Sequence, residues 1–256
     1  MPHRLNVYAL PQLVAPEALA GGATVVIDVL RASTTIVYAL ESGAAEVVPC
    51  LEVEEARQLA ARLPPDDTLL GGERGALAIA GFHLGNSPVD YSPYRVSGKT
   101  IVLTTTNGTR AIRHARLAGR VLIGAFVNVA AVYERLLDAE RIDLLCAGTE
   151  GQISEDDVLL AGLLVERLER QGGLSYELNA QAVTARETWL RAFALPRALG
   201  AEPLDAETLA AALRRSRGGQ KLAAVGLEAD TLAAAHMDRF RGVPHFDADS
   251  GRIRLG

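Results

Sequence analysis

Residues Ala23–Gly43 read ATVVIDVLRASTTIVYALESG, an apolar run that passes directly into a helical pattern. The β-branched residues of Ala23–Val29 predict a buried strand, because such side chains pack well on a pleated surface. Ser33–Ser42 then predicts a helix that ends at Gly43, a residue type common at helix C-termini. A buried strand followed at once by a helix is the repeating unit of α/β proteins, in which parallel strands form the sheet.

The same alternation of short apolar runs and helical patterns continues to about residue 171. The further predicted strands are Ala45–Pro49, Thr68–Leu70, Thr100–Thr105, Val121–Ala125 and Ile142–Cys146, and the further predicted helices are Glu52–Leu63, Thr109–Ala118, Val129–Ala139 and Ser154–Gln171. Gly71–Ser97 is rich in Gly, Pro, Ser and Asn and predicts a long loop, a feature that usually has a function inside a compact domain. From about Ser175 onward the chain is rich in Ala and Arg, with helices predicted at Ala206–Leu213 and Leu222–Ala235.

These patterns predict an α/β fold with a mostly parallel sheet flanked by helices and a helix-rich C-terminal portion. No linker and no internal repeat divides the chain. We therefore expect residues 1–256 to form a single unit, with a soft division near residues 172–180.

The composition excludes several classes of protein. The net charge is −5 and aromatic residues make up 5% of the chain, which argues against a nucleic-acid-binding protein. Two cysteines cannot make a disulfide framework, Met1–Leu10 does not resemble a signal peptide, and no apolar run is long enough to span a membrane. We therefore expect a cytoplasmic protein that binds neither nucleic acid nor membrane. Of the 26 basic residues only Lys99 and Lys221 are lysine. Either a compositional bias explains this skew, or some of the arginines hold anions.

Four polar segments follow predicted strands, namely Asp28–Thr35, Gly71–Asp90, Thr104–Arg110 and Ala147–Asp157. Ligands of open parallel sheets bind at the carboxyl ends of the strands. We therefore expect these four segments to converge on one site.

The segment Thr104–Thr109, TTTNGT, leaves a strand and enters a helix. Backbone N–H groups, threonine hydroxyls and a glycine that allows close approach suit a bound phosphate. A strand followed by an Asn-Gly turn and a threonine N-cap explains the same residues without a ligand.

Asp28 and Arg31 have a similar pair of interpretations. Asp28 at a strand end is a typical metal ligand, and the Arg31 guanidinium can grip an oxyanion with two hydrogen bonds. In the alternative, Asp28 pairs with Arg31, and Ser33 or Thr34 caps the helix.

Two acidic segments complete the candidates. Glu73 and Arg74 lie between glycines, which lets the backbone bring both side chains near a ligand or leaves them as a surface ion pair. Ser154 and Asp157 have the spacing of a capping box. The adjacent acids Asp156 and Asp157 can in addition help to hold a divalent cation.

Familiar phosphate-binding and redox motifs are absent. Gly98-Lys99-Thr100 has Pro93 where a phosphate-binding loop needs glycine, neither cysteine is followed by the arginine of a cysteine phosphatase, and no dinucleotide-binding glycine motif occurs. The second aspartate of aspartyl-phosphate phosphatases is replaced by Leu30. Oxygen ligands, hydroxyls and arginines remain, and these suit magnesium and phosphoryl transfer.

Five segments of the chain together are characteristic of a known family. They are DVLRASTT (Asp28–Thr35), GGERG (Gly71–Gly75), GFHLGNSP (Gly81–Pro88), GKTIVLTTTNGT (Gly98–Thr109) and CAGTEGQISEDD (Cys146–Asp157), and Ser216–Pro244 is similar as well. With these segments the chain resembles the 2-phosphosulfolactate phosphatase family over nearly its whole length. The resemblance implies a magnesium-dependent phosphomonoester hydrolase that releases sulfolactate and phosphate from (R)-2-phospho-3-sulfolactate, a step of coenzyme M biosynthesis. It also implies a homodimer.

The converging loops suggest a role for each candidate residue. We expect Asp28, Glu73 and Asp156 to be catalytic and to hold Mg²⁺, directly or through water. The residues expected to bind the small anionic substrate are Arg31, Ser33, Thr34, Arg74, Asn86, Ser87, Lys99, Thr105, Thr106, Asn107, Gly108 and Thr109. Either water or Asp28 attacks phosphorus, and Glu150 or Glu155 serves as base or acid. The alternatives are a phosphatase of the same fold acting on another phosphorylated hydroxy acid, and a non-catalytic binder of an anionic metabolite.

Overall fold

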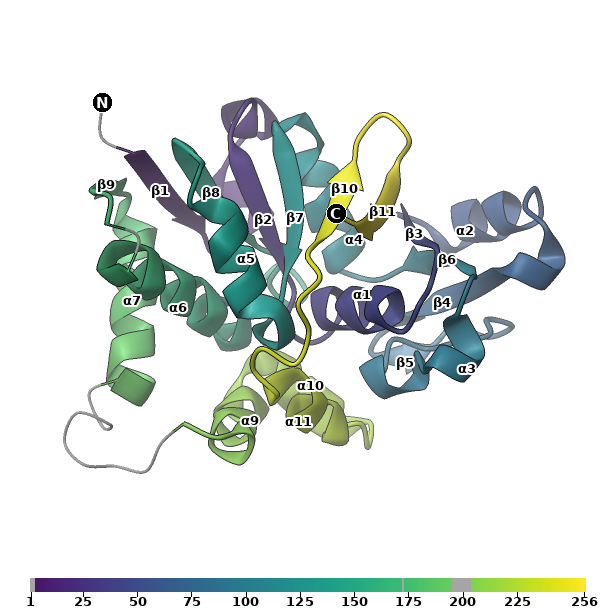
Figure 1. Ribbon diagram of the computed structural model, residues 1–256. Helices are drawn as coiled ribbons and strands as arrows, with labels where there is room; N and C mark the ends of the chain where they lie inside the picture. Colours follow the sequence, from purple (N-terminus) through teal and green to yellow (C-terminus); the bar gives the residue numbers. More distant parts are fainter. Residues whose placement is uncertain (1–2, 172, 195–203) are drawn as a thin grey trace.

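The computed structural model describes residues 3–171, 173–194 and 204–256 as one large sheet with helices on both faces (Figure 1). The strands are β1 (His3–Tyr8), β2 (Ala23–Ile27), β3 (Glu46–Cys50), β4 (Thr68–Arg74), β5 (Leu77–Ala78), β6 (Thr100–Thr104), β7 (Arg120–Gly124), β8 (Arg141–Cys146), β9 (Tyr176–Leu178), β10 (Pro244–Asp247) and β11 (Arg252–Leu255). The α-helices are α1 (Ala32–Glu41), α2 (Val53–Ala60), α3 (Pro93–Val96), α4 (Gly108–His114), α5 (Val129–Leu136), α6 (Glu155–Gln171), α7 (Ala180–Trp189), α9 (Ala206–Arg215), α10 (Arg217–Ala224) and α11 (Ala229–Ala235). The expected α/β class is confirmed.

The sheet consists of two parallel sets of strands joined by a hairpin. The strand order is β5-β4-β6-β3-β11-β10-β7-β2-β8-β1-β9. Strands β4, β6 and β3 are parallel to one another, and so are β7, β2, β8, β1 and β9. The C-terminal hairpin β10–β11 lies between the sets and pairs antiparallel with β7 and β3 (Figure 1). Because three antiparallel pairings separate β3 from β7, the two sets run in opposite directions.

Twist of the sheet allows the carboxyl ends of both sets to face the same space. Neighbouring strands rotate by about 20–25° relative to each other, so the five steps from β6 to β2 accumulate roughly 100–125°. Strands that would point to opposite edges of a flat sheet therefore approach one another at their ends. This arrangement differs from the single parallel edge that the sequence predicts, although it gathers the same loops.

Two apolar clusters cover the two faces of the sheet. On one face, Val25 and Ile27 of β2 pack in a cluster to which α5, α6, α7, α9 and α11 contribute. On the other face, Val26 packs in a cluster with side chains of α1 and α4. Successive side chains of β2 point to opposite faces of the sheet, and both faces are covered, which explains why the strand is apolar except for Thr24.

Several elements differ from the sequence-based expectation. The strands β1 and β9 and the hairpin β10–β11 were not predicted. Gly71–Arg74 is part of β4 rather than of a loop, and Gly72 pairs with Thr104 at φ +141°, where an added Cβ would collide with the Thr104 carbonyl. The predicted helix Leu222–Ala235 is wrong. It is divided into α10 and α11 around Gly226, which has φ +74°.

Two parts of the C-terminal expectation fall outside the described residues, namely residue 172 at the start of the soft division and residues 195–203. Among the helices that the structure describes, none combines the length and the apolar character that crossing a bilayer requires.

Candidate active site

A small, half-open cavity lies where the carboxyl ends of the strands converge. All four polar segments contribute to its lining, with Asp28, Leu30 and Arg31, then Glu73, Ala76 and Asn86, then Thr106 and Asn107, and finally Thr149. Helix α10 closes the remaining side with Gly218, Lys221 and Leu222. The cavity has a volume of about 30 Å³, which is room for roughly two water molecules.

Asp28 lines this cavity directly after β2, and only 5% of it is exposed. Its Oδ1 accepts a hydrogen bond from the Ala32 amide at 3.2 Å at the start of α1. Gly108 lies so close that an added Cβ would come within 2.6 Å of Asp28 Oδ2, so only glycine fits there. Burial, together with the charges of Asp156 and Glu73, raises the pKa of the Asp28 carboxyl to about 7.

Glu73 enters the cavity from β4, and its neighbour Arg74 points the other way, because successive side chains of a strand alternate. The two Glu73 oxygens accept hydrogen bonds from the Thr106 amide at 2.7 Å and the Ala76 amide at 2.7 Å. Glu73 thereby ties the end of β4 to the loop after β6. Arg74 instead donates to Leu51 O and Thr104 Oγ1 and is outside the cavity lining.

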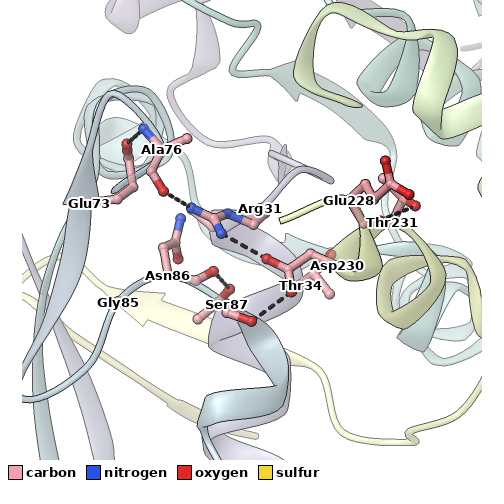
Figure 2. A network of polar contacts seen from close by, with 12 residues as sticks. Arg31, Thr34, Glu73, Ala76, Gly85, Asn86, Ser87, Glu228, Asp230 and Thr231 are labelled. Carbon is pink, nitrogen blue, oxygen red and sulfur yellow. Dashed lines mark hydrogen bonds and ion pairs between the residues drawn. The ribbon is translucent and has the colours of Figure 1, made fainter. Parts of the chain in front are cut away.

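Arg31 is held by a buried network that reaches helix α11 (Figure 2). Its Nη1 forms an ion pair with Asp230 Oδ2 at 2.7 Å, and both side chains are 3% exposed. Its Nη2 donates to Ala76 O at 2.7 Å, and Ser87 Oγ donates to Asp230 Oδ1 at 2.6 Å. Arg31 therefore pairs with Asp230 rather than with Asp28, and Ser87 supports that pair.

Two oxygen atoms in the cavity lining are buried without a hydrogen-bond partner, namely Asn86 Oδ1 and Thr106 Oγ1. Leaving a buried polar group unpaired costs about 1–3 kcal/mol, so such atoms mark places where a ligand can supply the missing partner. Thr105 and Thr109 are different, since they hydrogen-bond to each other's backbone and stabilise the loop.

Asp156 and Asp157 begin helix α6 behind the cavity, and both are 1% exposed. Asp157 does not form the predicted capping box, because its two oxygens accept from the Val29 amide at 2.8 Å and the Gly148 amide at 2.9 Å. It thus fixes the loops after β2 and β8 to each other. Asp156 accepts a short hydrogen bond from Ser154 Oγ. Burial raises the pKa of both carboxyls.

Lys221 and Glu150 form an ion pair at the edge of the cavity. Lys221 Nζ lies 2.6 Å from Glu150 Oε1, and the Lys221 and Glu150 side chains are 25% and 53% exposed. The Glu150 amide donates to Asn107 Oδ1 at 3.1 Å. The Lys221 ammonium lowers the pKa of Glu150, and the Arg217 charge adds to the effect. An exposed ion pair of this kind contributes only about 0.2–1 kcal/mol to stability, so either side chain can pair with another charged group at little cost.

The remaining predicted residues do not line the cavity. Lys99 contacts Asp66 and Asp67 at the opposite end of β6, Ser33 and Thr34 hydrogen-bond to the backbone around Asp28, and Glu155 is exposed. Sequence reasoning missed Lys221 and Asp230. The only signal for them was the similarity of Ser216–Pro244 to the family pattern.

Comparison with known proteins gives a consistent result. A family model described as 2-phosphosulpholactate phosphatase matches residues 8–249. A protein of Symbiobacterium thermophilum is 42% identical over 231 residues, which cover 90% of this chain and 93% of that protein. A protein of Deinococcus radiodurans is 40% identical over 260 residues, which cover 98% of each chain. One of Caldanaerobacter subterraneus is 48% identical over 146 residues, which cover 57% of this chain and 61% of that protein.

All three relatives carry the name "Probable 2-phosphosulfolactate phosphatase". The match covers most of the chain and includes the four segments that line the cavity. The resemblance seen in the sequence is therefore confirmed. The chain belongs to the 2-phosphosulfolactate phosphatase family, a family of phosphoric monoester hydrolases.

Proposed function

We propose that the cavity hydrolyses a phosphate monoester of a small anionic hydroxy acid, with (R)-2-phospho-3-sulfolactate as substrate and sulfolactate and phosphate as products. The observation that carries this proposal is the pair of carboxylates, Asp28 and Glu73, that share one cavity with the unpartnered oxygens of Asn86 and Thr106. Family membership supports the substrate. With that product, the reaction belongs to coenzyme M biosynthesis.

We propose Mg²⁺ as the cofactor. Among the described residues no group of three or more His, Cys, Asp or Glu side chains is arranged to hold a metal ion. Magnesium does not need such a group, because it usually binds one or two carboxylates and completes its shell with water and substrate phosphate. Asp28 and Glu73 are carboxylates of this kind. Burial and the charges of Asp156 and Glu73 raise the pKa of Asp28, which supports the fit, since a bound cation would stabilise the ionised carboxylate.

The parts of the site then have distinct tasks. Asp28 and Glu73 would hold the cation, which when bound would supply positive charge to the phosphate. Asp156 lies behind them and would act on the cation through water. The loop Thr105–Thr109, fixed to Glu73 through the Thr106 amide, receives the phosphate, and the Thr106 hydroxyl donates to one of its oxygens. Asn86 Oδ1 is an acceptor and would take a hydrogen bond from water in the cavity. Arg31 keeps the turn at Ala76 in place and supplies positive charge at the wall of the cavity. We propose water as the attacking group.

We further propose that the protein acts as a cytoplasmic homodimer. Large exposed apolar side chains on the segment from β5 to α3, namely Leu77, Val89 and Tyr94, support an interface there. A solution mass of one 27.1 kDa chain would contradict the dimer.

A panel of esters tests the substrate. With Mg²⁺ present, we expect kcat/KM for (R)-2-phospho-3-sulfolactate to exceed the values for 2-phospholactate, 2-phosphoglycerate and isopropyl phosphate by at least about tenfold, because each lost charge-assisted contact costs about 1.5–3 kcal/mol. Release of inorganic phosphate is the measurement. A higher kcat/KM for another phosphorylated hydroxy acid would identify that acid as the preferred substrate. If no ester releases phosphate, the result would contradict a phosphatase and favour a protein that binds an anionic metabolite without catalysis.

A further inference from the structure

We propose that Lys221 of helix α10 binds a second anionic group of the substrate, a carboxylate or a sulfonate. To do so, Lys221 gives up its ion pair with Glu150. The inference rests on the proposed function and deepens it by defining the class of substrate. That class is a phosphate monoester with a further anionic group close enough to reach α10 while the phosphate lies against the Thr105–Thr109 loop.

The first observation concerns the positive charges in the lining. Among the described residues that line the cavity, only Arg31 and Lys221 are cationic. Arg31 is not free to bind a substrate anion, because both its hydrogen-bonded nitrogens have buried partners, Asp230 and the Ala76 carbonyl. Exchanging Asp230 for a substrate anion would leave the Asp230 carboxylate buried without its partner. Lys221 has a partner that is half exposed and returns to water when it is released.

The second observation is the size of the cavity. Its water-sized space is about 30 Å³, and an open pocket of about 420 Å³ that shares Thr106 and Asn107 with it is lined by Glu150. A phosphorylated hydroxy acid that exceeds the small cavity therefore extends past Glu150. Glu150 follows Thr149 on one side of the cavity, and Lys221 is on α10 at the other side, so their ion pair spans the edge. A substrate anion that lies at this edge would contact Lys221 in competition with Glu150. A second anion on the substrate would replace Glu150 as the ion-pair partner of Lys221.

The third observation is that the backbone beneath both side chains is fixed. On α10, the Gly218 amide donates to Ser154 Oγ at 3.3 Å and Leu222 is 2% exposed. The Glu150 amide remains bonded to Asn107 Oδ1, and Arg217, one turn before Lys221, is near enough to lower the pKa of Glu150. Only the two side chains have to move, and Glu150 keeps a cationic neighbour after Lys221 has left.

The test compares Lys221→Met and Lys221→Arg on esters that differ in charge. For (R)-2-phospho-3-sulfolactate, Lys221→Met should raise KM by about 10–100-fold, the range of one charge-assisted hydrogen bond, while kcat falls by less than about threefold. For isopropyl phosphate, which has no second anion, KM should change by less than about twofold. Lys221→Arg should recover most of the affinity. Arg215→Met, which removes an exposed cation at the end of α9, is the matched control and should behave as wild type.

Equal changes in KM for both esters, or no change for either, would overturn the role of Lys221. Glu150→Gln removes the competing carboxylate and should lower KM for the sulfolactate ester. An unchanged or higher KM would contradict the exchange of partners.

Calorimetric titration with sulfolactate separates this inference from the proposed function. Sulfolactate carries the second anions but no phosphate, so its affinity should fall about tenfold or more in Lys221→Met whether or not any ester is hydrolysed. If wild type releases no phosphate but its affinity for sulfolactate depends on Lys221, the proposed function fails and the subsite stands. If sulfolactate does not bind, or binds both proteins equally, the subsite fails.

Discussion

Asp28→Asn should lower kcat for phosphate release by about 10²–10³-fold, the range seen when one group that stabilises charge in a transition state is removed. Asn keeps the shape of the side chain and can still accept the Ala32 amide, so the change removes only negative charge. In the proposed mechanism that charge holds the cation that neutralises the phosphate. Steady-state phosphate release at saturating Mg²⁺ is the measurement.

Thermal unfolding shows whether this variant is folded. Because the folded-state pKa of Asp28 is about 7 against an ordinary value of 3.8, the folded form binds the proton more tightly between these values. Without a cation, wild type should lose stability as the pH rises from about 4 to about 7, and Asp28→Asn should lose less. Its Tm at pH 8 in EDTA should therefore equal or exceed that of wild type. Asp138→Asn, at an exposed carboxyl, should retain activity. A folded Asp28→Asn with the wild-type rate would remove Asp28 from the mechanism.

Breaking the Arg31–Asp230 pair should have the largest effect on stability. Each of Arg31→Met and Asp230→Ala leaves one charge buried without its partner, and such losses amount to about 3–5 kcal/mol. Activity should fall as well, because Arg31 holds Ala76 O and the Ala76 amide in turn holds Glu73 (Figure 2). Urea denaturation of each single variant measures the free energy of unfolding.

The double variant Arg31→Met with Asp230→Ala tests whether the two residues act as a pair. It should be less destabilised than the sum of the single variants by at least about 1 kcal/mol, because neither charge is then left unpaired. Arg120→Met is the control, since Arg120 and Asp138 make a two-bond pair on the surface, and its effect should stay within about 1 kcal/mol. Strict additivity of the Arg31 and Asp230 effects would contradict the account of this network.

The elements that the sequence predicts well are those with a local signal. β2 and α1 follow from one apolar run and one helical pattern, and their bounds differ by one or two residues from those expected. The hairpin β10–β11 escaped prediction because its short strands lie in the C-terminal portion, whose Ala- and Arg-rich composition favours helices. Asp247–Gly251, the turn between them, carries a recognisable signal in Asp, Ser and Gly. The opposed strand sets could not be predicted, because they depend on where that hairpin inserts.

The candidate site likewise combines residues that have a local signal in the sequence with residues that have none. Asp28, Glu73, Asn86, Thr106 and Asn107 lie in polar segments that end strands, which made them candidates for one site. Their convergence also requires the twist of the sheet, because β2 belongs to one parallel set and β4 and β6 to the opposed one. Arg74 was misplaced, because the sequence put a loop where β4 continues and alternation turns the side chain away. Asp230 pairs with a residue 199 positions away, and no local pattern signals such a contact.

Phosphate release with the cation removed and restored tests the central claim most directly. The same preparation should hydrolyse (R)-2-phospho-3-sulfolactate with Mg²⁺, stop after EDTA, and recover when Mg²⁺ is added in excess, because two buried carboxylates cannot receive a phosphate without a cation between them. Undiminished hydrolysis in EDTA would contradict the account.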